Sequence, residues 1–375
     1  MAGKIQANIG GVIKNIKKIQ ANIGGVIKNV KKVQANIGGT IKTIWTSVNR
    51  TPRIFWASYY HDDYGDDKYH TAVGMLNYSG GSIYKNIGHN AEVITGAVMD
   101  EDGYGYTVSA AARYNRKYNP SGTQVLAVQN GATTDDIFQY QCVQKMNDDL
   151  HYVVASRYPP SGETMKVFKV RMSDLAVVKT YNISDSVQGN GSISLALDKL
   201  NRCYVGYTDS GGIDRLIRLS NELVYDSSFG KKSIGVGIPM LCDSDGNIIM
   251  KSTQSPSSYV YYLKKYTPSW ELVYSIDLQT TSSSEFSVGV DRTGNAYHGG
   301  KIYSPSGTEI GTYSGVTFND FDCNDRILMI TMPTIRLRTI SSVIWSYTIV
   351  SGATTNQNPR GGFEIGRVGT HGSAW

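Results

Sequence analysis

The sequence predicts an all-β fold: a β-propeller of seven four-stranded blades in residues 47–350, preceded by a repeated segment in residues 1–46. Forty glycines and 26 tyrosines stand against ten prolines, a composition that suits many short strands joined by tight turns. Two kinds of turn sequence alternate along the chain, at roughly the 40–50-residue spacing of propeller blades. With 40% apolar and 18% charged residues, the chain can bury a sizeable core.

The N-terminal segment is a unit of fourteen residues that occurs three times, at Ile5–Lys18, Ile19–Lys32 and Val33–Thr46. Its β-branched residues follow the 4,3 spacing of a coiled coil. Each unit also contains a Gly-Gly pair, and six glycines would destabilise a helix by about 6 kcal/mol relative to alanine. Gly-Gly between β-branched residues is typical of a two-residue hairpin loop. We therefore predict a meander of hairpins, with a helical segment as the alternative.

In these hairpins Ile9 would lie opposite Val12, Ala7 opposite Lys14, and Ile5 opposite Ile16. A lone hairpin buries too little to be stable, so the segment needs a partner, either copies of the same chain or a larger particle. We expect attachment through the repeated apolar and glycine positions, Ile5, Ile9, Gly10, Gly11, Ile19, Ile23, Gly24, Gly25, Ile37, Gly38 and Gly39.

The positive charge is concentrated in this segment. Residues 1–50 carry nine Lys or Arg and no acidic residue, so the remainder has a net charge of 6 − 9 = −3. The lysines recur with the repeat instead of clustering, and aromatic stacking residues are missing before Trp45, so we expect no nucleic-acid partner. The chain starts without an apolar run typical of a signal peptide, and no stretch approaches the roughly 20 apolar residues of a membrane span. We expect synthesis in the cytoplasm and no membrane insertion.

Seven segments share one design, in which a strand is followed by a polar turn and a second strand. Each of them predicts the outer hairpin of one blade. They are residues 75–84, 114–125, 168–178, 216–224, 263–273, 301–310 and 337–345. A second turn precedes most of them and predicts the hairpin of the two inner strands, with an Asp that accepts backbone N–H bonds. It begins at Asp100, Asp198, Asp243, Asp291 and Asp322, and in a weaker form at Asn147.

The first blade must be assembled from residues 54–60 and 71–75, and we expect the ring to close by pairing an N-terminal strand with C-terminal ones. Six or eight blades are the alternatives to seven.

The four cysteines lie far apart in apolar runs and are interpreted as core thiols. Residues 351–375 form a Gly-rich, loosely structured extension that is a candidate to complete the last blade.

The richest polar stretch lies at residues 61–70. His61, Asp62, Asp63, Asp66 and Asp67 could bind a divalent metal, although a solvated loop is the favoured interpretation. Asp100-x-Asp102-Gly and Asp243-x-Asp245-Gly resemble pieces of Ca²⁺ loops without the later ligands, so ordinary turns and no cofactor are favoured. Aromatic rings suit glycan faces and protein interfaces, and the candidates for ligand contact are Tyr59, Tyr60, Tyr64, Tyr69, Tyr104 and Tyr106.

No Gly-x-Ser-x-Gly, P-loop or Cys-x-x-Cys sequence occurs, so nucleophilic, phosphate and redox chemistry lack support and we assign no catalytic residue.

The repeats of residues 4–45 resemble short Ala-Asn-Ile-Gly-Gly units in tail-associated virion proteins of bacteriophages, especially phages of Gram-positive hosts. That resemblance implies a virion location, other tail proteins as partners of residues 1–46, and a homo-oligomer. The propeller would then bind a bacterial surface glycan or protein. The alternatives are a purely structural tail or collar component and an enzyme acting on surface polysaccharide.

Overall fold

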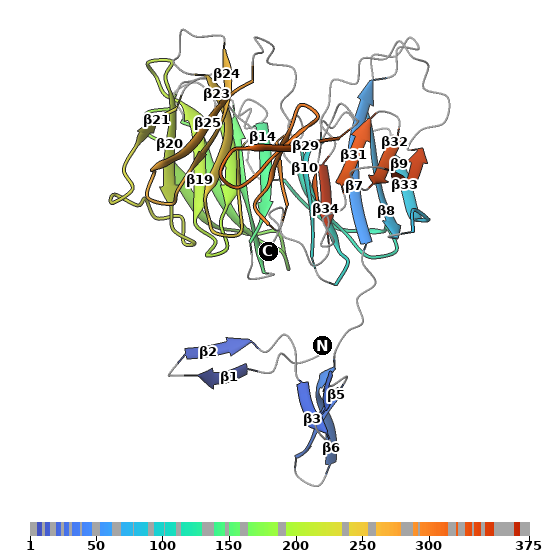
Figure 1. Ribbon diagram of the computed structural model, residues 1–375. Helices are drawn as coiled ribbons and strands as arrows, with labels where there is room; N and C mark the ends of the chain where they lie inside the picture. Colours follow the sequence, from blue (N-terminus) through green and yellow to red (C-terminus); the bar gives the residue numbers. More distant parts are fainter. Residues whose placement is uncertain are drawn as a thin grey trace. The chain divides into compact units, whose positions relative to one another are not determined.

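The computed structural model is all-β in the part of the chain that it describes. The described residues are 6–9, 12–15, 20–23, 26–29, 32–37, 40–46, 53–61, 69–77, 79–88, 94–100, 102–109, 114–129, 139–146, 150–157, 164–186, 193–234, 240–253, 260–278, 288–291, 293–313, 320–321, 327–331, 334–338, 342–348 and 364–367. The chain divides into two compact units, Met1–Thr51 and Pro52–Trp375. Figure 1 shows the strands of both units and labels many of them.

The first unit contains three separate two-stranded antiparallel hairpins. They are β1 (Gln6–Ile9) with β2 (Val12–Asn15), β3 (Gln20–Ile23) with β4 (Val26–Asn29), and β5 (Lys32–Ile37) with β6 (Thr40–Thr46). Ile9 pairs with Val12 and Ala7 with Lys14, which confirms the predicted register. The helical alternative is wrong, because the two described strands of each hairpin pair antiparallel with each other.

The predicted meander is corrected to three separate hairpins, since each described strand of this unit pairs only with the other strand of its own hairpin. Of the attachment positions, Ile9, Ile23 and Ile37 end the first strand of each hairpin. The others (Ile5, Gly10, Gly11, Ile19, Gly24, Gly25, Gly38 and Gly39), together with Ile16, lie outside the described residues.

The described strands of the second unit form seven four-stranded antiparallel sheets, which we number as blades along the chain. Blade 1 is β34 (Glu364–Arg367), β7 (Arg53–His61), β8 (Tyr69–Asn77) and β9 (Ser82–Gly88); blade 2 is β10 (Ile94–Met99), β11 (Gly105–Ser109), β12 (Tyr114–Tyr118) and β13 (Gln124–Gln129); blade 3 is β14 (Gln139–Lys145), β15 (His151–Arg157), β16 (Lys166–Arg171) and β17 (Val177–Asn182).

The remaining blades follow in chain order. Blade 4 is β18 (Ile193–Leu197), β19 (Cys203–Thr208), β20 (Asp214–Leu219) and β21 (Lys232–Ser233); blade 5 is β22 (Met240–Cys242), β23 (Ile248–Thr253), β24 (Tyr261–Tyr266) and β25 (Leu272–Asp277); blade 6 is β26 (Gly289–Val290), β27 (Ala296–His298), β28 (Lys301–Tyr303) and β29 (Glu309–Thr312); blade 7 is β30 (Asp320–Phe321), β31 (Ile327–Thr331), β32 (Thr334–Arg338) and β33 (Val343–Thr348).

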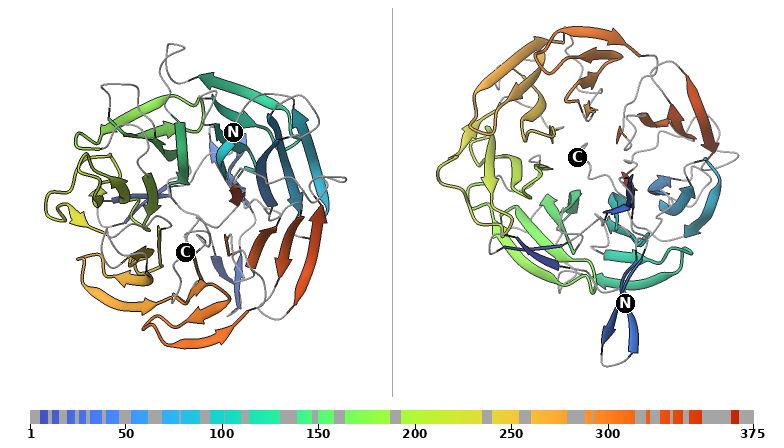
Figure 2. Two further views of the ribbon diagram at one scale, coloured as in Figure 1. Left: turned by 90° about the horizontal axis from the view of Figure 1, so that it is seen from above. Right: turned by 60° about the horizontal axis from the view of Figure 1, so that its bottom comes forward.

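The sheets stand around a common axis, and the β-propeller prediction is confirmed (Figure 2). The ring closes through β34, whose Ile365 pairs with Trp56 of β7 and whose Arg367 pairs with Ile54. The C-terminal segment therefore contributes the first strand of blade 1, and not a strand of the last blade. This strand lies toward the middle of the ring in Figure 2.

One end of the blades is closed by short turns, and we call it the turn face. Among the described residues, it carries the first-to-second strand turns of blades 2, 4, 5 and 6 and the third-to-fourth strand turns of blades 1 to 6. The Asp prediction is confirmed for Asp100, Asp198, Asp243 and Asp291, where one carboxylate oxygen accepts backbone N–H bonds from the residues two and four positions later at 2.8–3.0 Å. The Asp322 and Asn147 turns lie outside the described residues. We call the opposite end the loop face.

The outer turns share a position with left-handed backbone. Gly80, Gly122 and Gly307 occupy it in blades 1, 2 and 6, but Leu175 (φ 60°), Leu223 (φ 53°) and Trp270 (φ 74°) occupy it in blades 3, 4 and 5. Both leucines are buried in apolar clusters between blades. The indole of Trp270 stacks on Tyr266 with ring centroids 4.0 Å apart. Side-chain packing therefore offsets a backbone strain that glycine would avoid.

A cation joins each of four blades to the outer turn of the next blade, and we call these contacts the cation clasps; Lys169, Arg218 and Lys265 are buried and Lys117 is partly buried. The contacts are Lys117 Nζ to Met172 O at 3.1 Å, Lys169 Nζ to Asn221 O at 3.0 Å, Arg218 Nη1 to Pro268 O at 2.7 Å, and Lys265 Nζ to Pro305 O at 3.3 Å. Each cation lies on the third strand, two residues before the turn begins. Met75 and Ile302 hold the same position, just before a β-bulge, in blades 1 and 6.

The core is divided into apolar clusters between neighbouring blades. One of them packs Val153 and Val167 of blade 3 against Leu195 and Val205 of blade 4. Cys203 and Cys242 are buried in these clusters, and burial raises the pKa of both thiols. Within the described residues, no helix is long and apolar enough to cross a membrane.

Asn115 is a polar exception in the core between blades 2 and 3. It lies opposite Val108 and Val128 in the sheet, both of which pack in the apolar cluster shared with blade 3. Directly opposed residues occupy the same face of a sheet. Its side chain is fully buried, and in the described structure neither amide atom has a hydrogen-bond partner.

We expect Asn115→Leu to raise the free energy of unfolding by about 1–2 kcal/mol, because the substitution removes two unsatisfied polar atoms and adds apolar contacts. Urea unfolding followed by circular dichroism measures the change. Asn119→Leu is the control, since Asn119 Oδ1 accepts two backbone N–H bonds in the outer turn of the same blade and its loss should destabilise the protein. A less stable Asn115→Leu variant would contradict the assignment of Asn115 as an unsatisfied group.

Candidate functional site

Of the predicted metal and tyrosine positions in residues 59–70, Tyr59, Tyr60, His61 and Tyr69 lie at the loop-face end of blade 1. Tyr60 pairs with His70 and His61 with Tyr69 at the open end of the β7–β8 ladder, and Tyr59 pairs with Thr71. Tyr64, Asp62, Asp63, Asp66 and Asp67 lie outside the described residues. Among the residues that are described, no three His, Cys, Asp or Glu side chains group as metal ligands would.

Tyr104 and Tyr106 lie on the opposite, turn face, in blade 2. Tyr106 is 1% exposed, donates its hydroxyl to Asp100 Oδ2 at 2.7 Å, and its ring centroid lies 5.4 Å from Lys117 Nζ. The Tyr104 ring centroid lies 4.7 Å from the same Nζ. Assigning Tyr106 to ligand contact is therefore wrong, since its ring is buried beside the first clasp. Among the described members of the predicted set, Tyr59, Tyr60 and Tyr69 lie on the loop face and Tyr104 and Tyr106 on the turn face, so these five do not form one site.

The candidate Ca²⁺ loops have the geometry of ordinary turns. Asp100 Oδ1 accepts the backbone N–H groups of Asp102 and Tyr104, and Asp243 Oδ1 those of Asp245 and Asn247. Asp243 Oδ2 lies 2.9 Å from Lys265 Nζ. These carboxylates are engaged by donors of the turn and of the clasp. Burial raises the pKa of Asp100, although the hydrogen bond from Tyr106 lowers it.

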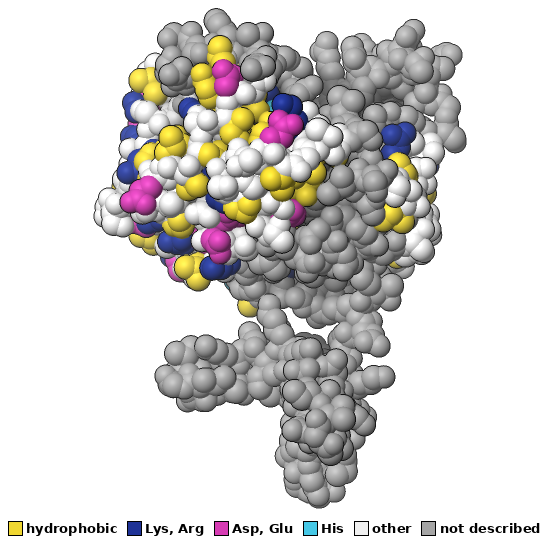
Figure 3. Space-filling view, in the orientation of Figure 1, with side chains coloured by type: hydrophobic (Ala, Val, Ile, Leu, Met, Phe, Trp, Pro, Cys, Tyr) yellow, Lys and Arg dark blue, Asp and Glu magenta, His cyan; other side chains and the backbone are white. Residues whose placement is uncertain are grey.

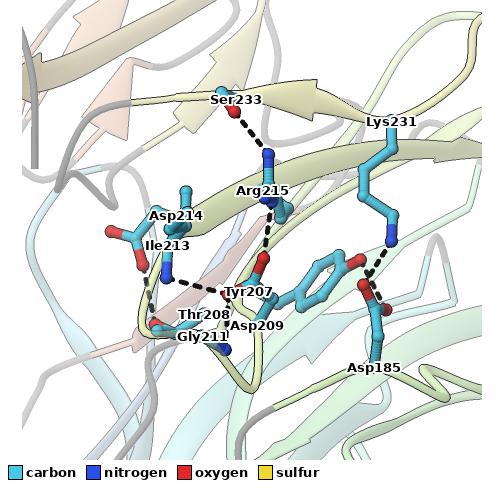
Figure 4. Close-up of polar contacts among 10 residues, drawn as sticks. All are labelled: Asp185, Tyr207, Thr208, Asp209, Gly211, Ile213, Asp214, Arg215, Lys231 and Ser233. Carbon is cyan, nitrogen blue, oxygen red and sulfur yellow. Dashed lines mark hydrogen bonds and ion pairs between the residues drawn. The ribbon is translucent and has the colours of Figure 1, made fainter.

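A group of polar side chains on the loop face lies at the junction of blades 3 and 4 (Figure 4). We call it the blade 4 polar cluster and define it as Asp185, Tyr207, Asp209, Arg215, Lys231 and Ser233. Tyr207 lies on β19, Asp209 in the β19–β20 turn, Arg215 on β20, Lys231 and Ser233 at β21, and Asp185 after β17 of blade 3.

Asp185 ties the two blades together. Its Oδ1 accepts the Tyr207 hydroxyl at 2.9 Å, and its Oδ2 forms an ion pair with Lys231. Its backbone oxygen also accepts the N–H of Ser210 at 2.8 Å. Blade 4 therefore holds the Asp185 carboxylate through two contacts and its backbone through a third.

Asp209 and Arg215 form the other half of the cluster. Asp209 Oδ1 accepts the N–H groups of Gly211 and Ile213 at 2.9 Å each, which closes the β19–β20 turn. Its Oδ2 accepts Arg215 Nε at 2.7 Å. Arg215 Nη1 donates to the Ser233 hydroxyl on the neighbouring strand. One guanidinium group is thus positioned by a carboxylate and a hydroxyl.

The protonation states of this cluster favour binding over proton transfer. Burial acts to raise the pKa of Asp209, but the hydrogen bonds of Ile213, Arg215 and Gly211 leave it lowered. Burial also acts to raise the pKa of Asp185, but the hydrogen bonds from Lys231 and Tyr207 leave that pKa lowered. Burial and Asp185 raise the pKa of Tyr207. At neutral pH the carboxyls are charged and the phenol is neutral, whereas a general acid or base works best with a pKa near the working pH.

Acid is expected to weaken this junction. A carboxyl with a lowered folded-state pKa contributes stability above its unfolded value of about 3.9, and that contribution is lost as the pH falls through the folded value. Asp185→Asn should therefore reduce the stability difference between pH 5 and pH 2.5 by about 0.2–1 kcal/mol, a small value because the pair is partly exposed. Urea midpoints at both pH values measure it, and an unchanged difference would contradict the proposed ionisation.

Sequence reasoning missed this cluster. The Asp209-Ser-Gly-Gly segment has the composition of an Asp turn, which was a usable signal for Asp209 and the nearby Arg215. Asp185 belongs to another blade, and only the packing of the ring brings it to Lys231 and Tyr207.

No family model matches the chain, and no curated protein matches it. Among solved structures, the chain is similar to a catalytically inactive virginiamycin B lyase from Staphylococcus aureus with quinupristin, at 9% identity and TM-score 0.51, covering 83% of this chain and 96% of that one. It is also similar to the dihydro-heme d1 dehydrogenase NirN in complex with DHE, at 12% identity and TM-score 0.51, covering 80% and 64%. At these identities the likeness shows the propeller fold alone.

Proposed function

We propose that this chain is a non-enzymatic virion protein of a bacteriophage tail, which docks through residues 1–46 and displays its propeller to a host surface or a neighbouring virion protein. The observation that carries the proposal is the row of three hairpins ahead of the propeller, each with only two described strands. The resemblance of the repeats to tail-associated proteins supplies the virion assignment.

The hairpins support docking because they repeat one register. Ala7 faces Lys14, Ala21 faces Lys28, and Ala35 faces Lys42 across the ladders, listed in chain order. Two-stranded hairpins are marginal alone and gain stability against a partner. Three equivalent hairpins on one chain can also bind together, which raises overall affinity by avidity without any new kind of contact.

The propeller supports ligand display. Its turn face is fixed by the Asp turns and the cation clasps, so the loop face stands on a rigid support. On the side drawn in Figure 3, Lys and Arg side chains lie interspersed with Asp and Glu over the described residues. Recognition would then depend on placed groups such as the blade 4 polar cluster, and less on a field of one sign.

The test has two arms. Fluorescently labelled full-length protein is added to intact cells of a bacterial host, and saturable binding that a cell-wall extract competes away is the expected result. In the second arm, full-length protein and a chain lacking residues 1–46 are compared for incorporation into particles, where the shortened chain should fail. Equal incorporation would overturn the docking role. Incorporation without cell binding would instead support a purely structural tail component.

A further inference from the structure

The hydrogen-bond donors of Arg215 are only partly used. A guanidinium carries five N–H groups. In the described structure, Nε bonds to Asp209 and Nη1 to Ser233, while Nη2 contacts no acceptor. The side chain is 24% exposed, so water reaches it. The Asp209 carboxylate and the Ser233 hydroxyl hold the guanidinium group in place, and its other N–H groups have no acceptor in the described structure.

Lys231 and Ser233 add further donors at the same end of β21. Lys231 uses one acceptor, Asp185, and its side chain is 40% exposed. An ammonium has three N–H groups, so two remain. Ser233 accepts from Arg215, which leaves its own O–H hydrogen to donate. Arg215 and Ser233 are paired across the β20–β21 ladder, so their positions are fixed by the sheet.

The carboxylate acceptors of the cluster are already engaged. Asp185 receives Tyr207 and Lys231 on its two oxygens. Asp209 receives two backbone N–H groups on one oxygen and Arg215 on the other. Each carboxylate oxygen of the cluster therefore already accepts at least one donor, whereas the guanidinium, the ammonium and the hydroxyl each keep N–H or O–H groups with no acceptor in the described structure. Figure 4 shows these residues together.

From this balance of donors and acceptors we infer that the blade 4 polar cluster binds an oxyanion group of a surface polymer. Arg215 contacts the anion directly, with Lys231 and Ser233 beside it. Carboxylate, sulfate and phosphate all present several acceptor oxygens that a planar guanidinium can meet with two bonds. The inference rests on the proposed display function and narrows its ligand to an anionic polymer.

Three polymers distinguish the source of the anion. The full-length protein is titrated calorimetrically in 0.15 M NaCl with polygalacturonate, heparin and polyphosphate, and with dextran as the uncharged polymer. The basic N-terminal segment is present in every variant, so its contribution is constant. Arg215→Gln is compared with Arg171→Gln, which removes the same charge from an exposed ion pair at the outer turn of blade 3, on the turn face.

We expect Arg215→Gln to weaken binding of at least one polyanion about tenfold, the size of a lost charge-assisted hydrogen bond. Arg171→Gln should stay within about twofold, and Lys231→Gln and Ser233→Ala should each lose about threefold. The last two variants keep the inference testable if Arg215→Gln does not fold. Equal weakening by Arg215→Gln and Arg171→Gln would overturn it, as would polyanion binding no tighter than that of dextran.

Failure here is separable from failure of the display function. If labelled protein binds cells and Arg215→Gln binds them equally well, the oxyanion inference falls and the display function stands. If no variant binds cells but the polyanion titrations show the Arg215-specific loss, the display proposal falls while the anion site is supported.

Discussion

Replacing Lys265 with methionine is expected to lower the free energy of unfolding by about 3–5 kcal/mol, the cost of breaking a buried ion pair. Lys265 Nζ lies 2.9 Å from Asp243 Oδ2, and the two side chains are 4% and 2% exposed. Methionine keeps most of the aliphatic stem but leaves the Asp243 carboxylate buried without its cation. It also removes the bond to Pro305 O that holds blade 6.

Urea unfolding measures the loss, and Lys301→Met is the matched control on the next blade. Lys301 pairs with Glu309 at the same distance of 2.9 Å, but the side chains are 51% and 44% exposed. Solvent screens an exposed pair, so the control should change the stability little. The double variant Lys265→Met, Asp243→Asn should recover part of the loss. A Lys265→Met cost as small as that of the control would show that the clasp does not stabilise the ring.

Replacing Trp56 with alanine is expected to cost about 3–5 kcal/mol, as for other large-to-small substitutions in a core. Trp56 is fully buried on β7. Its backbone pairs with Ile365 of β34, and its ring lies across Gly74, where a Cβ atom would come within 2.4 Å of the indole. The ring also contacts Tyr347 of blade 7 at 6.4 Å between centroids. The lost indole would leave a cavity where the first and last blades meet.

Hydrogen exchange distinguishes this effect from general destabilisation. The β7 amides that pair with β34 should exchange faster in Trp56→Ala than in a control of matched size loss, Trp270→Ala at an outer turn. Trp270 is only partly buried, so its loss should cost less. If both variants raise exchange equally throughout the ring, Trp56 is not specific to the closure.

Much of the propeller could be predicted because its turns are local. An Asp that accepts N–H bonds two and four residues later leaves its mark within five residues, and Asp100, Asp243 and Asp291 carry that mark in the sequence. The Gly-Gly hairpins of the first unit are local in the same way. The helical alternative remained open because a repeat of fourteen residues also satisfies heptad spacing.

The clasps and the polar cluster could not be predicted with the same ease, because each depends on two blades. A basic residue stands two positions before the outer turn at Lys117, Lys169, Arg218 and Lys265. That regularity was visible, but a lysine on an alternating strand usually faces water, and the carbonyl it binds lies about 40–55 residues away. Tyr106 was misassigned for a related reason, since a tyrosine's burial depends on the neighbouring blade.

The pairing of β34 with β7 also sets an order for biosynthesis. Residue 56 leaves the ribosome some three hundred residues before its partner, residue 365. Until then one side of β7 is an unpaired strand edge, the kind of surface through which nascent chains associate wrongly. The cation clasps form in the same order of synthesis, since each cation is made before the carbonyl oxygen that accepts its hydrogen bond. Blades can be added one by one, but the circle is completed only by residues 364–367.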